Sequence, residues 1–228
     1  MPRSLPGSGE RLIKQRVWDL PTRLFHWSLV VLVGLSWWSA ETHRYDLHLW
    51  FGYGVLFLLL FRILWGFVGS STARFATFVR GPAALFTYFR NRFRWTVAGH
   101  TPLGALSVLA LLLMLVVIVG TGLVALDEDG LAGGPLAHLV SLATSDAATE
   151  LHEELFDFLL ILIGLHIAAI LLYRLALGLN LLGPMITGKA ELAPGVEPMR
   201  QVPPPVVIAS VAVALALTAW IVAGAPPL

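Results

Sequence analysis

Five long apolar stretches alternate with polar segments along the chain. They cover about residues 24–40, 48–68, 102–125, 151–177 and 205–224. Each is long enough for a helix that crosses a bilayer, which needs about 17 to 25 residues. Tryptophans flank the first stretch at both ends, as in the aromatic belts at the two bilayer surfaces. The pattern predicts an all-α fold, an integral membrane helical bundle whose last element is a fifth, C-terminal transmembrane helix.

The composition fits a membrane protein. Of the 228 residues, 57% are hydrophobic and only 13% are charged, which is typical of integral membrane proteins. The chain contains no cysteine. This excludes disulfides, iron–sulfur clusters, thiolate zinc sites and covalently attached c-type haem. Any haem must therefore be held without covalent links, and the seven histidines become the main candidate ligands.

Basic residues are concentrated in three of the polar segments. Residues 1–23, 69–100 and 174–204 hold 13 of the 15 lysines and arginines. Because loops rich in Lys and Arg remain in the cytoplasm, we expect a cytoplasmic N-terminus. After five spans the C-terminus is then periplasmic, in a bacterial inner (plasma) membrane. Residues 69–100 also carry interleaved aromatic residues, which indicates a segment lying on the membrane surface and not a nucleic-acid site.

Two histidines interrupt the fourth apolar stretch. His152 and His166 are 14 residues apart, which is nearly four helical turns, so both rings point to one face about 21 Å apart along the axis. An imidazole in hydrocarbon is costly unless its lone pair is used. This spacing therefore indicates two functional sites, one near each membrane surface.

Depth in the membrane pairs these histidines with two others. Successive spans run in opposite directions, so His48, at the start of the second span, lies at the outer level with His152. His26, at the start of the first span, lies at the inner level with His166. The sequence thus predicts two sites with two histidines each, on facing helices of a bundle.

The ligand set favours haem over a zinc ion. A protein zinc site takes three or four side chains, commonly including Cys or carboxylates, whereas two facing histidines suit a six-coordinate haem iron. With both axial positions filled, the expected chemistry is one-electron transfer. We therefore predict two non-covalent haem b groups, with iron bound by His26/His166 and His48/His152. Cationic or hydrogen-bonding partners for the haem propionates are expected at Arg23, Arg62 and His100 on the inner side and at Arg44 on the outer side.

Several segments resemble a known family. They are VWDLPTRLFHW (17–27), HLWFGYGVLFLLLFRILWGFVGS (48–70), GHTPLGALSVLALLL (99–113), LHEELFDFLLILIGLH (151–166) and NLLGPMITG (180–188). Over about residues 16–190 the chain resembles the bacterial cytochrome b-561 family, which includes the b-type cytochrome subunits of nickel–iron hydrogenases. The resemblance implies a four-helix diheme core with His26, His48, His152 and His166 as axial ligands. It also implies electron exchange between a quinone pool and a partner redox protein.

These observations together predict a membrane electron-transfer subunit. Residues 1–23 form a cytoplasmic arm, residues 24–190 the diheme membrane domain, and residues 191–228 a connector with the fifth helix. The partners expected are lipid, quinone, and a hydrogenase, dehydrogenase or c-type cytochrome; a homodimer is left open. No acid–base constellation is evident in the sequence, and a quinone site is expected near Arg62 and His100. Two alternatives stay open: a haem-free transporter that uses its histidines as a proton relay, and a cofactor-free anchor for a partner enzyme.

Overall fold

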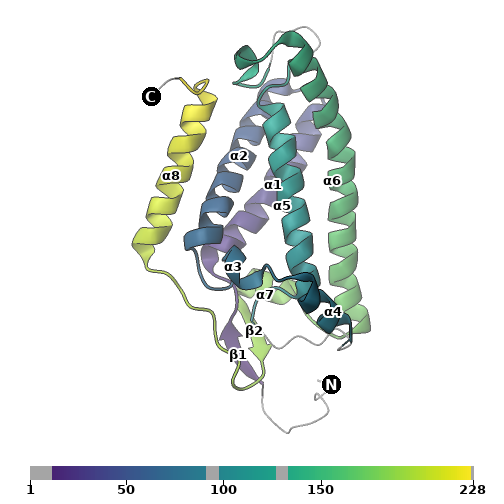
Figure 1. The fold of residues 1–228 in the computed structure, drawn as a ribbon, viewed down its shortest axis with the longest axis vertical. Coiled ribbons are helices and arrows are strands. Elements are labelled where there is room, and N and C mark those ends of the chain that lie inside the picture. Colours follow the sequence, from purple (N-terminus) through teal and green to yellow (C-terminus); the bar gives the residue numbers. More distant parts are fainter. Residues whose placement is uncertain (1–11, 91–97, 127–132, 227–228) are drawn as a thin grey trace.

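The chain folds mainly into long helices. The computed structural model describes residues 12–90, 98–126 and 133–226. The long helices are α1 (Leu20–Glu41), α2 (Tyr45–Val68), α5 (Pro102–Gly122), α6 (Leu142–Ala176) and α8 (Pro204–Val222). Shorter elements are β1 (Ile13–Arg16), α3 (Phe75–Phe78), α4 (Pro82–Arg90), η1 (Ala137–Leu139), α7 (Leu182–Thr187) and β2 (Lys189–Leu192). The long helices run side by side, and the strands lie with α3, α4 and α7 at one end of the bundle (Figure 1).

Four of the five expected spans are confirmed as helices long and apolar enough to cross a membrane: α2, α5, α6 and α8. The first expected span is helix α1, which is not in this set. Arg23, His26 and Glu41 lower its mean hydropathy. Its 22 residues nevertheless correspond to about 33 Å, at about 1.5 Å per residue. Whether α1 crosses the membrane therefore stays a prediction.

Side-chain caps start three of the long helices. Asp19 accepts a hydrogen bond from the backbone N–H of Thr22 at 2.6 Å before α1. Thr101 accepts one from Gly104 before α5, and Ser141 accepts one from Thr144 before α6. The α6 cap corrects the sequence prediction, because the helix begins at Leu142 and not near Leu151. The polar residues before the fourth apolar stretch are therefore the first turns of α6. The Ser141 side chain accepts from one of the backbone N–H groups that the start of a helix leaves unpaired.

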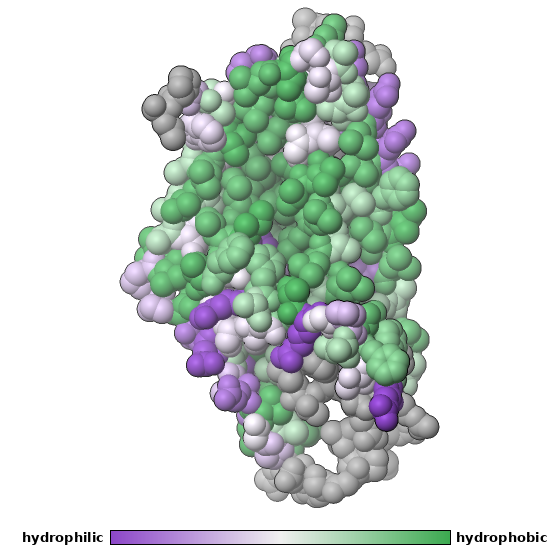
Figure 2. All heavy atoms as spheres, in the orientation of Figure 1, coloured by the Kyte–Doolittle hydropathy of each residue, from purple (hydrophilic) through white to green (hydrophobic). Residues whose placement is uncertain are grey.

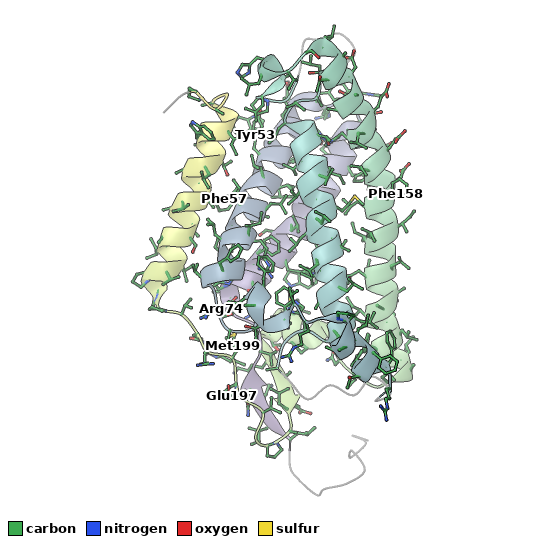
Figure 3. The ribbon with its side chains drawn as sticks, in the orientation of Figure 1. Tyr53, Phe57, Arg74, Phe158, Glu197 and Met199 are labelled. Carbon is green, nitrogen blue, oxygen red and sulfur yellow. The ribbon has the colours of Figure 1, made fainter. Side chains whose placement is uncertain are left out.

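A small sheet ties the N-terminal segment to the connector before α8. Strand β1 pairs antiparallel with β2, with Ile13 opposite Leu192 and Arg16 opposite Lys189. Strand β2 begins directly after Gly188, whose φ of 79° is the left-handed conformation that favours glycine. Met199 and Glu197 lie beside the strands in the connector (Figure 3). The sheet corrects the all-α prediction in this detail. It also holds the last part of the predicted cytoplasmic arm in place. Two basic residues from the start of that arm, Arg3 and Arg11, lie outside the described residues.

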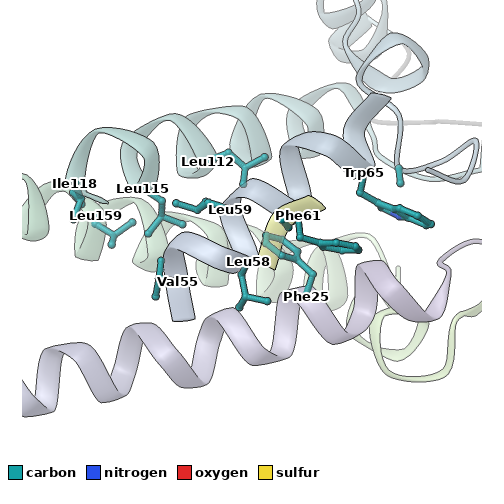
Figure 4. Packing of buried hydrophobic residues seen from close by; sticks show 12 residues of the cluster. Phe25, Val55, Leu58, Leu59, Phe61, Trp65, Leu112, Leu115, Ile118 and Leu159 are labelled. Carbon is teal, nitrogen blue, oxygen red and sulfur yellow. The ribbon is translucent and has the colours of Figure 1, made fainter. Parts of the chain in front are cut away.

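Helix α2 is the centre of the apolar core. It packs against α1, α5 and α8, and α5 packs in turn against α6. Figure 4 shows buried side chains of α2 between those of α1, α5 and α6. The cluster includes Phe25, Val55, Leu58, Leu59, Phe61, Trp65, Leu112, Leu115, Ile118, Leu159 and Ala214. Because its members come from all five long helices, the core fixes the depth at which polar residues of different helices meet.

The outer surface of the bundle is strongly apolar. Hydrophobic side chains cover the middle of the face shown in Figure 2, and hydrophilic ones gather toward its ends and along one edge. On α6, Leu165 is 62% exposed and Leu175 is 81% exposed. Large exposed apolar surfaces of this kind are expected where lipid, and not water, surrounds a protein.

Candidate functional site

The structure brings His48 and His152 together at the end of the bundle opposite the sheet. His48 lies in the first turn of α2, and His152 lies on α6. Their ring centroids are 6.0 Å apart and the ring planes are nearly perpendicular, at 85°. Two residues separated by more than 100 positions thus present their imidazoles to each other across the bundle.

Both of these rings are oriented by backbone carbonyl groups of neighbouring helices. The Nδ1 atom of His48 lies 2.9 Å from the carbonyl oxygen of Ser36 on α1. The Nδ1 atom of His152 lies 2.7 Å from the carbonyl oxygen of Ile118 on α5. A carbonyl oxygen only accepts hydrogen bonds, so each Nδ1 carries the proton and donates it. The Nε2 atom of each ring therefore keeps its lone pair, which is the form of histidine that binds a metal.

Gly122 allows His152 to reach this position. A Cβ atom at Gly122 would lie 2.8 Å from Cε1 of the His152 ring, well inside van der Waals contact. Any other residue at the end of α5 would displace the imidazole. The glycine is thus required by the close approach of α5 and α6 beside His48 and His152, called the outer pair after the level that the sequence predicts for it.

The second pair, His26 and His166, lies toward the sheet end of the bundle and is called the inner pair after the level that the sequence predicts for it. Both side chains are partly buried, and they are near enough to interact electrostatically. The Nδ1 atom of His166 lies 3.1 Å from the hydroxyl oxygen of Ser107 on α5. The Nδ1 atom of His26 is buried and has no hydrogen-bond partner among the described residues. The two pairs therefore differ in how their rings are held.

The outer pair fits a bound haem. Two imidazoles on opposite sides of one iron, each with a metal–nitrogen bond of about 2 Å, hold their ring centroids about 6 Å apart. The distance between His48 and His152 matches this value. Near the inner pair, Nδ1 of His26 and Nη1 of Arg62 are buried and have no hydrogen-bond partner among the described residues. A polar ligand at this place would satisfy them.

Arg62 is a buried cation on α2 near the inner pair. Its side chain is only 2% exposed. The guanidinium carbon lies 5.1 Å from the Phe75 ring centroid and 5.9 Å from that of Phe78. Cation–π contacts of this kind compensate part of the cost of burial, and the carboxylate of Asp19 adds an electrostatic attraction. A charge held at this depth is available to an anionic group of a ligand.

His100 lies against the same aromatic cluster, just before α5. Its ring centroid is 4.5 Å from that of Phe78 and 4.6 Å from that of Trp18. Burial, and then the nearby charges of Arg62 and His166, lower the pKa of His100 to about 3. The ring is therefore neutral at neutral pH. Its Nδ1 atom is buried without a hydrogen-bond partner among the described residues, so the site has one further polar atom to offer a ligand.

The two other predicted propionate partners have different contacts. A guanidinium nitrogen of Arg23 donates a hydrogen bond to the carbonyl oxygen of Ile186, which fixes α1 to α7. Arg44 is exposed, and its guanidinium carbon lies 5.7 Å from the ring centroid of Trp38. The structure thus places Arg62 and His100 together at the Phe78 ring. Arg23 and Arg44 instead contact Ile186 and Trp38.

Three side chains near the inner pair were not identified from the sequence. Asp19 accepts hydrogen bonds from Thr22 and, at 3.0 Å, from Nε1 of the buried Trp65. Ser107 contacts His166. The order Asp-Leu-Pro at the start of α1 is a recognisable cap signal. Trp65 and Ser107 carry no such signal, since a lone serine or tryptophan in an apolar helix is usually a packing residue.

Comparison with known proteins identifies the family. The model of the family described as prokaryotic cytochrome b561 matches residues 17–188, which include all four paired histidines. No curated protein and no solved structure matches the chain. The matched region runs from the end of β1 to the turn before β2 and covers well over half of the sequence. The chain therefore belongs to the prokaryotic cytochrome b561 family, whose members are bacterial membrane b-type cytochromes that transfer electrons.

Proposed function

We propose that this chain is a diheme electron-transfer subunit that connects a quinone pool to a partner redox protein. The observation that carries the proposal is the geometry of His48 and His152. Their rings are 6.0 Å apart, and both Nδ1 atoms lie within 3.0 Å of backbone carbonyls. His26 and His166 form the second pair, closer to the sheet end. A partner hydrogenase, dehydrogenase or c-type cytochrome is compatible with this role.

The residues of the chain would hold the two haem groups and set their surroundings. His48 and His152 would bind one iron, and His26 and His166 the other. Where Nδ1 makes a hydrogen bond, as in His48, His152 and His166, the iron would be bound through Nε2. When bound, each haem supplies one-electron chemistry with no open iron position for oxygen. The apolar core around α2 would limit the access of water to the region between the two histidine pairs. Arg62 would offer a positive charge to the propionates of the inner haem. Arg23 and Arg44 have other contacts and are not part of this proposal.

The proposed orientation follows the positive-inside rule. Helix α1 would be the first of five spans, with the N-terminus and the sheet in the cytoplasm and the C-terminal end of α8 in the periplasm. In support, α1 packs on the membrane helix α2. The polar sheet and the short helices α4 and α7 lie at the end of the bundle where α1 begins (Figure 1). A reporter fused to either terminus would test this orientation.

A quinone site near Arg62 and His100 is the part of the proposal that substitution tests most directly. Arg62→Ala and His100→Ala should slow haem reduction by added quinol at least tenfold, because the site loses its buried cation or its imidazole. Rapid-mixing absorbance would measure this rate. Reduction by dithionite should remain complete, since dithionite does not need the site. Arg174→Ala, at an exposed position near the end of α6, is the control. Unchanged quinol-driven reduction in both variants, with both haems retained, would remove the quinone site from this position.

Ser107 should tune the redox potential of the inner haem. With Nε2 of His166 on iron, Nδ1 donates its proton to the Ser107 hydroxyl, which raises the basicity of the imidazole. Ser107→Ala removes this acceptor and should therefore raise the potential. At a fixed applied potential the ratio of reduced to oxidised inner haem should rise about threefold. This corresponds to a midpoint potential about 28 mV higher, at 59 mV per tenfold change. A potentiometric titration would measure this shift.

Thr121→Val is the matched control for Ser107. The Thr121 hydroxyl lies 3.4 Å from Nδ1 of His152, but that atom also lies 2.7 Å from the carbonyl oxygen of Ile118. The stronger acceptor remains in the variant, so neither potential should change. Ser107→Thr should keep the normal inner potential. If Ser107→Ala left both potentials unchanged, or shifted both equally, Ser107 would have no specific role at His166.

A further inference from the structure

A groove opens at the sheet end of the bundle, between the starts of α1 and α8. Its volume is about 580 Å³. Leu20 and Arg23 of α1 form one wall, Val207 and Ile208 of α8 the other, and Arg16 and Lys189 lie at its polar end. Trp65 of α2, which is fully buried, lies behind the lining. The groove thus combines an apolar part between two helices with a rim of three cations.

The apolar part of the groove lies at the level where two membrane helices begin. Both α1 and α8 pack against α2, and the groove separates them at this end. Ile208 is 68% exposed and Leu20 is 57% exposed. An apolar gap between helices in a bilayer is filled by lipid, because water in the gap would be in unfavourable contact with apolar surface. Hydrocarbon chains are therefore the natural occupants of this part.

The rim of the groove has an unbalanced positive charge. Arg16 and Lys189 are directly opposite each other in the β1–β2 ladder, an arrangement of like charges that destabilises a strand pair. Arg23 adds a third cation, one of whose guanidinium nitrogens is buried without a partner among the described residues. Asp19 provides the one carboxylate among the described residues of the lining, and it is buried and already accepts hydrogen bonds from Thr22 and Trp65. An anion between the three cations would offset their repulsion.

We propose that this groove binds an anionic glycerophospholipid. Its phosphate lies between Arg16, Arg23 and Lys189, where arginine offers paired N–H donors to phosphate oxygens. One acyl chain runs along Leu20, Val207 and Ile208. Basic pockets at the ends of membrane helices are suited to such headgroups because the charge and the apolar wall are satisfied by one molecule. The lipid would tie the β1–β2 sheet to the membrane beside α8. The inference depends on the membrane location of the chain and not on the haem sites.

Lipid retention by the intact protein tests the site. The purified full-length chain would be equilibrated in nanodiscs of equal phosphatidylglycerol and phosphatidylcholine. It would then be transferred to detergent, and the lipid retained per chain would be measured by native mass spectrometry. We expect preferential retention of phosphatidylglycerol. Arg16→Gln/Lys189→Gln should lower that retention at least fivefold. Lys14→Gln/Arg174→Gln removes the same charge at exposed residues outside the groove lining and should leave it within twofold.

A second variant tests the acyl-chain part of the groove without changing any charge. Ile208→Trp fills the wall of the groove and should also lower phosphatidylglycerol retention at least fivefold. Val213→Trp, at a 46% exposed position further along α8, should have no effect. The circular dichroism spectrum and the elution volume of each variant would show that the fold is intact.

Three results would overturn the proposal. Equal retention of the two lipids would show that the cations do not select an anion. Displacement of the lipid by millimolar inorganic phosphate, with no effect of Ile208→Trp, would show a free phosphate site. A co-purified quinone that Ile208→Trp removes and Arg16→Gln/Lys189→Gln leaves in place would show that the groove takes a neutral ligand. Because none of these readouts uses electron transfer, failure here is distinguishable from failure of the proposed function.

Discussion

His152→Ala is expected to halve the haem content, from two b-type haems per chain to one. The substitution removes one of the two imidazoles whose ring centroids are 6.0 Å apart and leaves His48 alone at the outer site. The inner pair, held by α1 and α6 in a separate part of the bundle, should retain its haem. His166→Ala should produce the reciprocal loss. Haem released as the pyridine complex, divided by protein concentration, would measure both results.

The control for this experiment is another histidine. His43 lies in the turn between α1 and α2, and its Nδ1 atom contacts the hydroxyl of Tyr45 at 3.2 Å. His43→Ala should retain both haems. If His152→Ala and His166→Ala both kept two haems per chain, the pairing proposed here would be wrong, since each iron would then have ligands elsewhere.

Trp65→Ala is expected to cause the largest loss of stability. Trp65 is fully buried in the α2 core and stacks with Phe61, at a centroid distance of 5.6 Å. Removing a buried tryptophan side chain costs about 3–5 kcal/mol of unfolding free energy. The indole N–H also satisfies the buried carboxylate of Asp19 at 3.0 Å, so its loss leaves that group without one of its donors. Unfolding in mixed micelles, followed by circular dichroism, would measure the effect.

Two further variants separate packing from hydrogen bonding at this position. Trp65→Phe keeps most of the apolar volume but loses the N–H donor, and should cost about 1–3 kcal/mol. Trp50→Ala changes a tryptophan on the same helix that is 70% exposed, and should alter the unfolding free energy by about 0.5 kcal/mol or less. Equal effects of Trp65→Ala and Trp50→Ala would contradict the central packing role of Trp65.

The parts of the fold that could be predicted are the long helices, because hydrophobic residues follow one another over many positions in them. Four of the expected spans match helices that are long and apolar enough to cross a membrane. The proximity of His48 and His152 could also be predicted, because alternating helices fix the depth of each residue. A 14-residue spacing then fixes the face on which His152 and His166 lie. Depth and face together determine which residues of a bundle meet.

Contacts that depend on local geometry could not be predicted in this way. The β1–β2 pairing joins residues about 175 positions apart through four-residue strands, too short to show a period. The polar first turns of α6 resemble a loop in hydropathy although Ser141 caps them as helix. Ser107 contacts His166 only because α5 and α6 pack closely, and no feature of its sequence neighbourhood indicates this. The groove likewise depends on how α1 and α8 each pack against α2.

The most direct test of the proposed function is the haem stoichiometry of the wild-type chain. Iron and pyridine-extracted haem would be quantified per chain in a folded, haem-replete preparation, together with the dithionite-reduced-minus-oxidised spectrum. Two b-type haems per chain, with spectra typical of six-coordinate iron in both redox states, are the predicted result. A folded protein without haem would contradict the proposal and would favour a transporter that uses its intramembrane histidines as a proton relay.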